Sequence, residues 1–283
     1  MDPIERRNEI EKAIGFKLYS RPMSGTIKEL DKLSKSLLFA ELSNIAYLRE
    51  DLATRAAQDI GFTESRFFNR EGSQAYIFET NSDCAIVCRG TEPNEWNDIK
   101  ADINAASVVA ETIGRVHKGF KREVDDLWPE LETAIVENKK MLWIAGHSLG
   151  GAMATICASR CKLSHIQSNP IELYTFGSPR VGNKRYVNYT VVVHIRWVNN
   201  NDIVTRVPPN WMGYRHTGEE MYLNAHGKIR KMTKWQRTKD RWRGFWMGAK
   251  VGSIDPFSDH SLDQYAKCIY TAICAQERTT PLL

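Results

Sequence analysis

The chain has 283 residues, a formal net charge of +5 and 26% charged residues. Its 42% hydrophobic content is enough for one sizeable core, and the composition is that of an ordinary globular protein. No run of about 18 apolar residues occurs, so no membrane-spanning helix is expected. The first residues, MDPIERRNEIEKAIG, are charged and contain no apolar leader segment.

The cysteines do not have the spacing of a small disulfide-rich domain, because most lie inside apolar or helical stretches. They are Cys84, Cys88, Cys157, Cys161, Cys268 and Cys274. The pattern predicts free, buried thiols in a reducing compartment. A zinc site would need C-x-x-C pairs with further cysteines or histidines, so neither a metal nor a cofactor is expected.

The first half of the chain begins with a polar segment, residues 1–25, that is predicted to be a loosely ordered lead-in. Apolar residues at steps of three and four predict helical structure within 26–60. The runs QAYIFE (74–79) and CAIVCRG (84–90) are separated by turn residues and predict a hairpin. Residues 117–138 are typical of an amphipathic helix.

In the second half, buried strands alternate with helices. The predicted elements are strands at 141–146, 171–177 and 191–199, a helix rich in small residues at 148–161, a hairpin at 214–223 and a last helix near 260–275. This alternation predicts an α/β fold with a mainly parallel central sheet flanked by helices. Since no linker or internal repeat interrupts residues 26–283, we expect a single domain there.

The pentapeptide Gly146-His147-Ser148-Leu149-Gly150 fits the pattern G-x-S-x-G. A strand-like stretch precedes it and a helix-forming stretch follows it, as the motif requires. The serine then occupies a strained turn that exposes its hydroxyl, and the amides at the helix start can stabilise an anion. The alternative is a glycine-rich turn with no chemistry, and the context favours a nucleophile.

A serine nucleophile needs a histidine base and an orienting carboxylate, which follow it in the order Asp/Glu, then His. The histidines after the serine are His165, His194, His216, His226 and His260. His194 falls in a strand run and His216 in the predicted hairpin, so core roles are expected for them. The preferred base is His260, which stands in a loop just before the last helix.

The preferred acid is Asp202, because it follows the predicted strand at 191–199 directly. Three weaker candidates follow no convincing strand: Asp240, Asp255 and Asp259. Two donors are then needed for the oxyanion. Leu149 offers its backbone N–H, and Thr91, at the end of CAIVCRGT, offers its N–H and its hydroxyl. A plain turn at Arg89-Gly90-Thr91 is the alternative.

Eight stretches of the sequence together resemble one known family, the class 3 (fungal-type, triacylglycerol) lipases of the α/β-hydrolase superfamily. They are CRGT (88–91), EWNDIKAD (95–102), VHKGF (116–120), AGHSLGGA (145–152), YTFGSPRVGN (174–183), NNNDIVTRVPP (199–209), YRHTGEEMY (214–222) and DHSLDQY (259–265). The resemblance covers about residues 30–275. It implies the α/β-hydrolase fold and hydrolysis of acylglycerol esters through an acyl-enzyme, without metal or cofactor.

The resemblance also implies a triad of Ser148, His260 and Asp202, with Thr91 and Leu149 at the oxyanion hole. Secreted members of the family carry a leader and often disulfides. Because this sequence shows neither, we expect a cytoplasmic protein, with secretion by a route that needs no leader as the alternative. The stretch at 92–102, where the family has its lid, is short and polar, which leaves activation at an oil–water interface open.

The segment 226–250 carries nine Lys/Arg residues and one acid. Its apolar residues recur at steps that predict a helix with an apolar stripe and cationic flanks: Ile229, Met232, Trp235, Trp242 and Trp246. Such a helix either packs on the domain with a solvated basic face or contacts an anionic lipid surface. No groove-reading motif supports nucleic acid as a partner.

The sequence therefore predicts a serine hydrolase that cleaves carboxylic esters of acylglycerols or other lipids, with a lipid or ester substrate as its partner. One alternative keeps the chemistry and changes the substrate, namely a phospholipase A1 that acts on anionic membranes. A second alternative is a lipid-binding module without activity, against which the complete set of site residues argues. A thiol enzyme is not expected, since no cysteine occupies a strand–turn–helix elbow.

Overall fold

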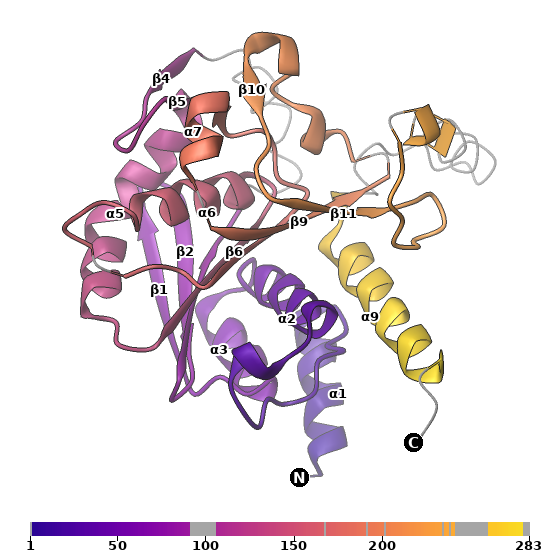
Figure 1. The fold of residues 1–283 in the computed structure, drawn as a ribbon. Helices are drawn as coiled ribbons and strands as arrows, with labels where there is room; N and C mark the ends of the chain where they lie inside the picture. The colour runs from indigo at the N-terminus through magenta and orange to yellow at the C-terminus, as the bar shows by residue number, and fades with distance from the viewer. Residues whose placement is uncertain are drawn as a thin grey trace.

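The computed structural model describes residues 2–90, 106–166, 168–190, 192–200, 202–233, 235–237, 239–240 and 260–279. Its centre is a seven-stranded sheet in the order β1-β2-β3-β6-β7-β9-β11 (Figure 1). The strands are β1 (Glu64–Arg70), β2 (Ser73–Glu79), β3 (Asp83–Cys88), β6 (Met141–His147), β7 (Glu172–Phe176), β9 (Val193–Asn199) and β11 (Glu219–Leu223).

The sheet is mainly parallel, as the sequence predicts. Strands β3, β6, β7, β9 and β11 pair in parallel with their neighbours, whereas β1, β2 and β3 pair antiparallel. The antiparallel pairing of β2 with β3 confirms the hairpin predicted at 74–79 and 84–90. Strand β1 was not predicted, because its sequence, ESRFFNR, has no regular alternation.

Helices cover both faces of the sheet (Figure 1). One face carries α1 (Pro3–Ile14), α2 (Lys32–Ile45), α3 (Glu50–Asp59) and α9 (Leu262–Thr279), and the other carries α5 (Lys118–Glu137) and α6 (Leu149–Arg160). Alternate side chains of each strand enter the two cores. On β6, Trp143 and Ala145 pack on the first side, while Leu142 and Ile144 pack on the second. None of the helices within the described ranges is long and apolar enough to cross a membrane.

A smaller antiparallel sheet lies beside the carboxyl ends of the main strands, next to α7 (Lys184–Tyr189). Its strands are β10 (Tyr214–Arg215), β8 (Gly182–Asn183), β5 (Arg115–His117) and β4 (Ser107–Val109). The hairpin predicted at 214–223 is therefore wrong, because β10 pairs with β8 while β11 pairs in parallel with β9. Alternation along the chain identifies strands but does not specify their partners.

The N-terminal segment is not the loosely ordered lead-in that its polarity predicts. Helix α1 buries Ile10 and Ile14 in the same core as α2 and α9. The Arg7 guanidinium donates to the Asp59 carboxylate and to the Ser20 carbonyl, which fastens the segment to α3. The two buried isoleucines lie one helical turn apart on the same face of α1. The overall polarity of the segment does not reveal such a spacing.

The basic segment also departs from its prediction. Residues 226–233 are not helical, because Ile229 forms an isolated bridge with Leu223 of β11. Among the described residues of this segment, helical conformation is found at 235–237 and 239–240. The predicted continuous apolar stripe is thus wrong for Ile229 and Met232. Trp242 and Trp246, its last two residues, lie outside the described residues. The lid stretch 92–102 lies outside them as well.

Candidate active site

Ser148 stands at the turn between β6 and α6, with φ 59° and ψ −131°. A positive φ is unfavourable for a residue with a side chain, so surrounding contacts must hold this conformation. The Ser148 amide donates to the Phe176 carbonyl of β7 at 2.9 Å. Within the described residues its Oγ is buried and makes no hydrogen bond.

The two motif glycines permit this turn because the backbone is crowded around them. A Cβ on Gly146 would lie 2.3 Å from the Gly150 carbonyl oxygen, and a Cβ on Gly150 would lie 2.2 Å from the Cys88 carbonyl oxygen. Helix α6 therefore begins directly against the ends of β6 and β3. This is the crowding that the sequence motif requires, but the Ser148 side chain has 0% exposure and is not exposed as the motif predicts.

Asp202 and His260 form a buried pair. Asp202 follows β9 by three residues, and its Oδ2 lies 3.0 Å from Nδ1 of His260, which precedes α9. The same carboxylate accepts hydrogen bonds from the Tyr265 hydroxyl at 2.8 Å and from the Val204 amide at 3.0 Å. Both partners are buried, with 0% exposure at Asp202 and 4% at His260. A carboxylate at Nδ1 places the proton there, so Nε2 is the basic nitrogen.

Gly177 belongs to the stretch YTFGSPRVGN. The spacing of motifs in the sequence assigned no role to that stretch, but the structure gives one to this glycine. It follows β7 with φ +59°, a conformation that favours glycine. A Cβ at this position would lie 2.7 Å from both Asp202 Oδ2 and His260 Nδ1. The glycine therefore leaves the space that the carboxylate–imidazole pair occupies.

The topology brings the serine next to this pair. Strands β6 and β9 flank β7, so Ser148 and Asp202 follow the carboxyl ends of the two parallel strands on either side of β7. His147, directly before the serine, packs its ring 4.4 Å from the His260 ring. The bond between Ser148 Oγ and the base is not formed in this resting structure, which is common before a substrate binds.

Of the two predicted oxyanion donors, Leu149 lies within the described residues and Thr91 does not. Leu149 is the first residue of α6, and an amide in the first turn has no partner within its own helix. Thr91 lies outside the described residues. Its neighbour Gly90 lies close to the serine, because a Cβ on Gly90 would be 3.2 Å from Ser148 Cβ.

The other candidate residues have structural partners. His194 Nε2 lies 2.8 Å from Thr175 Oγ1, and burial lowers the pKa of His194 to about 3. His216 Nε2 donates to the Thr205 carbonyl at 2.8 Å, and His165 lies on the surface beside Glu132. None of these rings joins the pair around His260.

Among the alternative acids, Asp240 is buried away from a base. It accepts hydrogen bonds from the Tyr222 hydroxyl at 3.1 Å and from the Ala225 amide at 3.0 Å. Asp255 and Asp259 lie outside the described residues. Asp202 is thus the candidate acid that the described structure brings to His260.

The cysteines on β3 and α6 are poorly suited to thiolate chemistry. Burial raises the pKa of the Cys84 thiol to about 12. A hydrogen bond with Cys157, together with burial, raises the pKa of Cys88 well above its usual value. All six cysteines are free thiols, and within the described residues no group of three or more His, Cys, Asp or Glu side chains is arranged to hold a metal ion.

Three residues of the site were not found from the sequence: Tyr265, His147 and Tyr47. Tyr265 lies within the DHSLDQY stretch, one turn and a half beyond His260, so the spacing on α9 could have indicated it. His147 is the variable position of the serine motif, which the pattern treats as neutral. Tyr47 lies just after α2 and reaches the site only through the fold.

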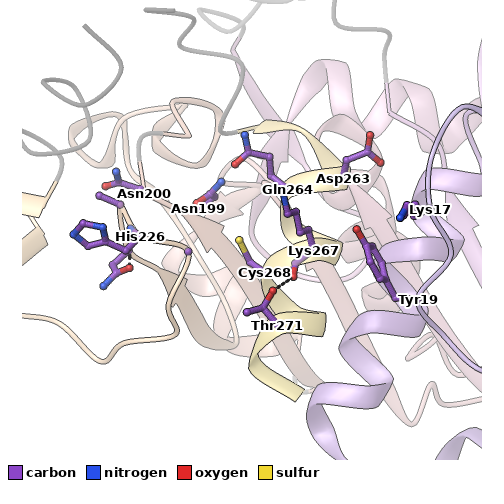
Figure 2. A pocket seen from close by; sticks show the side chains of 13 residues that line it. Lys17, Tyr19, Asn199, Asn200, His226, Asp263, Gln264, Lys267, Cys268 and Thr271 are labelled. Carbon is purple, nitrogen blue, oxygen red and sulfur yellow. Dashed lines mark hydrogen bonds between the residues drawn. The ribbon is translucent and has the colours of Figure 1, made fainter. Parts of the chain in front are cut away.

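A pocket of about 740 Å³ lies beside the elements that support the pair, but Ser148, Asp202 and His260 do not line it. Figure 2 shows polar side chains around it that come from the N-terminal segment, the end of β9, the turn after β11 and α9: Lys17, Tyr19, Asn199, Asn200, His226, Asp263, Gln264 and Lys267. The pocket is therefore separate from the candidate active site.

Comparison with known proteins gives a consistent result. Residues 85–212 match the family described as Lipase (class 3). A lipase of Rhizomucor miehei is 37% identical over 119 residues, 38% of this chain and 33% of the relative. A secreted mono- and diacylglycerol lipase of Fusarium solani is 35% identical over 118 residues, 39% of this chain and 34% of the relative. The matched part thus spans about a third of the length of these relatives.

A solved structure reported as a triacylglycerol lipase with a serine protease triad also matches. It aligns with a TM-score of 0.58 and 25% identity, and covers 70% of this chain and 82% of that one. The mainly parallel sheet with helices on both faces is therefore the α/β-hydrolase fold.

These relatives contradict the expectation of a cytoplasmic location, since several matching lipases are named as secreted. That expectation rested on the composition of the first residues and on the free thiols, and neither feature reports the route that a protein takes. The matched residues 85–212 contain the serine motif and Asp202, and the fold beyond them agrees with the same group of proteins. Within residues 85–212, the chain is thus similar to the class 3 lipases.

Proposed function

We propose that this protein hydrolyses carboxylic esters of acylglycerols and related lipids, with Ser148 as nucleophile, His260 as base and Asp202 as the orienting acid. The observation that carries the proposal is the buried Asp202–His260 pair, joined at 3.0 Å, beside a serine in a strained turn. The names of the related lipases and the triad reported for one matching structure support it.

In the first half of the reaction, Ser148 Oγ attacks the ester carbonyl carbon while His260 Nε2 accepts the hydroxyl proton. Asp202 holds the ring in the correct tautomer and stabilises the imidazolium that forms. The developing oxyanion accepts hydrogen bonds from the Leu149 amide and from the second proposed donor, Thr91. Collapse of the tetrahedral intermediate breaks the bond to the alcohol oxygen, which takes the proton from His260 and leaves.

In the second half, water attacks the acyl-enzyme. His260 accepts the proton of the water and then returns it to Ser148 Oγ as the fatty acid leaves. Because Ser148 Oγ makes no hydrogen bond in the resting structure, its bond to His260 is expected to close when substrate occupies the site.

The test is hydrolysis of p-nitrophenyl esters with acyl chains from acetyl to palmitoyl, and of emulsified triolein. Ser148→Ala should abolish turnover of every ester, whereas Ser24→Ala, at an exposed serine, should leave it unchanged. Equal activity of wild type and Ser148→Ala would exclude the proposed nucleophile. A rise in triolein turnover as droplets form would indicate interfacial activation.

A second candidate, a phospholipase A1 that acts on anionic membranes, is favoured by the surface of residues 226–240. Trp235 is 66% exposed, and the Lys239 ammonium lies 3.6 Å from the centre of its ring. Three further cations nearby in sequence are exposed: Lys228, Arg230 and Lys231. An exposed indole with surrounding cations is typical of contact with an anionic lipid interface.

This candidate is tested by turnover of phosphatidylglycerol vesicles beside triolein, with Trp235→Ala as the variant. Loss of vesicle turnover in the variant, with soluble esters hydrolysed as before, is expected if this surface recruits the enzyme to membranes. Equal turnover of vesicles by wild type and variant would exclude that role for Trp235.

A further inference from the structure

His147, the residue directly before Ser148, has both ring nitrogens engaged. Its Nε2 lies 2.7 Å from the backbone carbonyl oxygen of His260, and its Nδ1 lies 3.0 Å from the hydroxyl of Tyr47. A carbonyl oxygen only accepts, so Nε2 must carry the hydrogen. In the neutral ring Nδ1 is then the acceptor, and Tyr47 is the donor.

The His147 ring also limits where the His260 ring can lie. The two rings are 4.4 Å apart between centroids, with 35° between their planes. Asp202 is hydrogen-bonded to His260 at Nδ1, and the backbone of Gly177 packs against the same edge of the ring. His147 adds a hydrogen bond to the backbone of His260 and a contact along its ring. His260 is thus held at its backbone, at one nitrogen and along the ring.

The His147 ring has to be neutral because His260 becomes positively charged during the reaction. Burial and the nearby His260 hold the pKa of His147 well below its ordinary value. The polar and charged groups that face it are Tyr47, His260 and, through His260, Asp202, while the Arg89 guanidinium lies 5.5 Å from the centre of the Tyr47 ring. A second cation beside the imidazolium that His260 forms in each step would oppose the reaction.

We propose that His147 is a positioning residue for His260, held by Tyr47 as the neutral ring with its hydrogen on Nε2. The inference rests on the proposed reaction of Ser148, His260 and Asp202, and it assigns a task to the variable position of the serine motif. His147 does not touch the substrate. It fixes the direction of His260 Nε2, on which proton transfer from Ser148 depends.

Three variants separate positioning from simple packing. His147→Phe keeps a ring but removes the donor to the His260 carbonyl, and should lower kcat about 100-fold with KM changed by less than about threefold. His147→Gln offers an amide donor in place of Nε2, and should recover kcat to within about tenfold of wild type. His165→Gln, at an exposed histidine, is the matched control and should leave kcat unchanged.

The kinetic assay uses p-nitrophenyl butyrate with all variants and with Ser148→Ala. If Ser148→Ala is inactive and His147→Phe retains wild-type kcat, the positioning role is wrong while the proposed function stands. If Ser148→Ala is as active as wild type, the proposed function itself fails. Loss of kcat in His147→Phe without recovery in His147→Gln would also contradict the positioning role, because a hydrogen-bond donor at this position would then not restore the activity.

A second measurement does not depend on activity. Nitrogen-15 NMR of the histidine rings in the inactive Ser148→Ala protein reports the tautomer and the protonation of each ring, and His147→Gln identifies the His147 signals. We expect the neutral form with hydrogen on Nε2 throughout the range of pH in which the protein is folded. Titration of His147 near the ordinary histidine pKa, or hydrogen on Nδ1, would overturn the proposal.

Discussion

The region where β6, β7 and β9 end, here called the middle of the sheet, and the β11 edge both carry charged side chains, but they hold them in different ways. At the middle, Asp202 has 0% exposure and accepts hydrogen bonds from Tyr265, Val204 and His260. At the edge, Arg237 pairs with Glu220 and stacks 5.1 Å from the centre of the Tyr222 ring, while its own side chain is 28% exposed. The first arrangement is fully buried, and the second is partly exposed to solvent.

This difference indicates what each region can tolerate. A buried carboxylate that loses a partner has no water to replace it, so the remaining groups must shift. An ion pair at the surface contributes little, because water and salt screen it. We therefore expect changes at the middle of the sheet to alter the reaction, and changes at the edge to alter association with lipid without altering the chemistry.

The largest effect is expected for Asp202→Asn. An amide in place of the carboxylate favours the wrong tautomer of His260, which should lower kcat about 10⁴-fold. The measurement is turnover of p-nitrophenyl butyrate, with circular dichroism to confirm folding. Asp263→Asn is the matched control, since that exposed acid lies near the start of α9 and pairs with Asn44. A loss below about tenfold in Asp202→Asn would contradict the role of the carboxylate.

Gly177→Ala tests whether the backbone holds the pair. The added methyl would lie 2.7 Å from both Asp202 Oδ2 and His260 Nδ1, so we expect kcat to fall about 100-fold. Gly213→Ala is the control, because Gly213 has a similar positive φ of +89° but no atom within 4 Å of the added methyl. Both variants should lose some stability from the backbone conformation, and only Gly177→Ala should lose kcat. Equal kinetics of the two variants would show that the contact is unimportant.

Glu41 on α2 is a buried carboxyl for which no ion pair is found among the described residues. Burial raises the pKa of its carboxyl from 4.5 to about 7, although the Tyr19 and Ser20 amides donate to it. The pKa is raised in the folded state, so its contribution to stability is complete below pH 4.5 and is lost as pH rises through about 7. The loss in unfolding free energy is on the order of 3 kcal/mol.

Glu41→Gln should remove this part of the pH dependence, because glutamine keeps an acceptor and has no charge. Thermal melts at about pH 5 and about pH 8 should therefore differ less in the variant than in wild type. The exposed Glu9 provides the control, and Glu9→Gln should melt as wild type does at both values. If the Glu41→Gln protein keeps the wild-type difference between the two melting temperatures, the buried Glu41 carboxyl is not the source of this pH dependence.

The smallest effect is expected at the edge, for Arg237→Ala. Removing this half-exposed partner of Glu220 should change the unfolding free energy by less than about 1 kcal/mol, because Arg196 remains paired with Glu220. Hydrolysis of soluble esters should not change. Co-sedimentation with anionic vesicles should weaken, since the cationic segment is then less firmly attached. A large loss of soluble-ester turnover would show that the edge and the middle are coupled.

The sequence predicts the middle of the sheet well because its signals are local. The strand before Ser148, the glycines on either side of it and the position of Asp202 directly after a strand can all be recognised within a few residues. His260 followed from two features together, since it comes after the acid in the chain and stands in a loop just before the last helix.

Contacts that depend on the fold could not be predicted in this way. Tyr47, His147 and His260 are far apart in the chain, and the packing of α2 against β6 and of α9 against α2 brings them together. The prediction of a helix next to the β11 edge was wrong for a related reason. Ile229 fits a helical step in the sequence, but a bridge to Leu223 gives it an extended conformation that neighbouring residues do not reveal.

The central claim is that Ser148 is activated by the Asp202–His260 pair, and a fluorophosphonate tests it most directly. After incubation with the reagent, intact-mass measurement and peptide mapping should show one adduct, on Ser148, that is absent from Ser148→Ala and strongly reduced in Asp202→Asn. An adduct on another residue, or no adduct in an active preparation of the wild-type protein, would contradict the account.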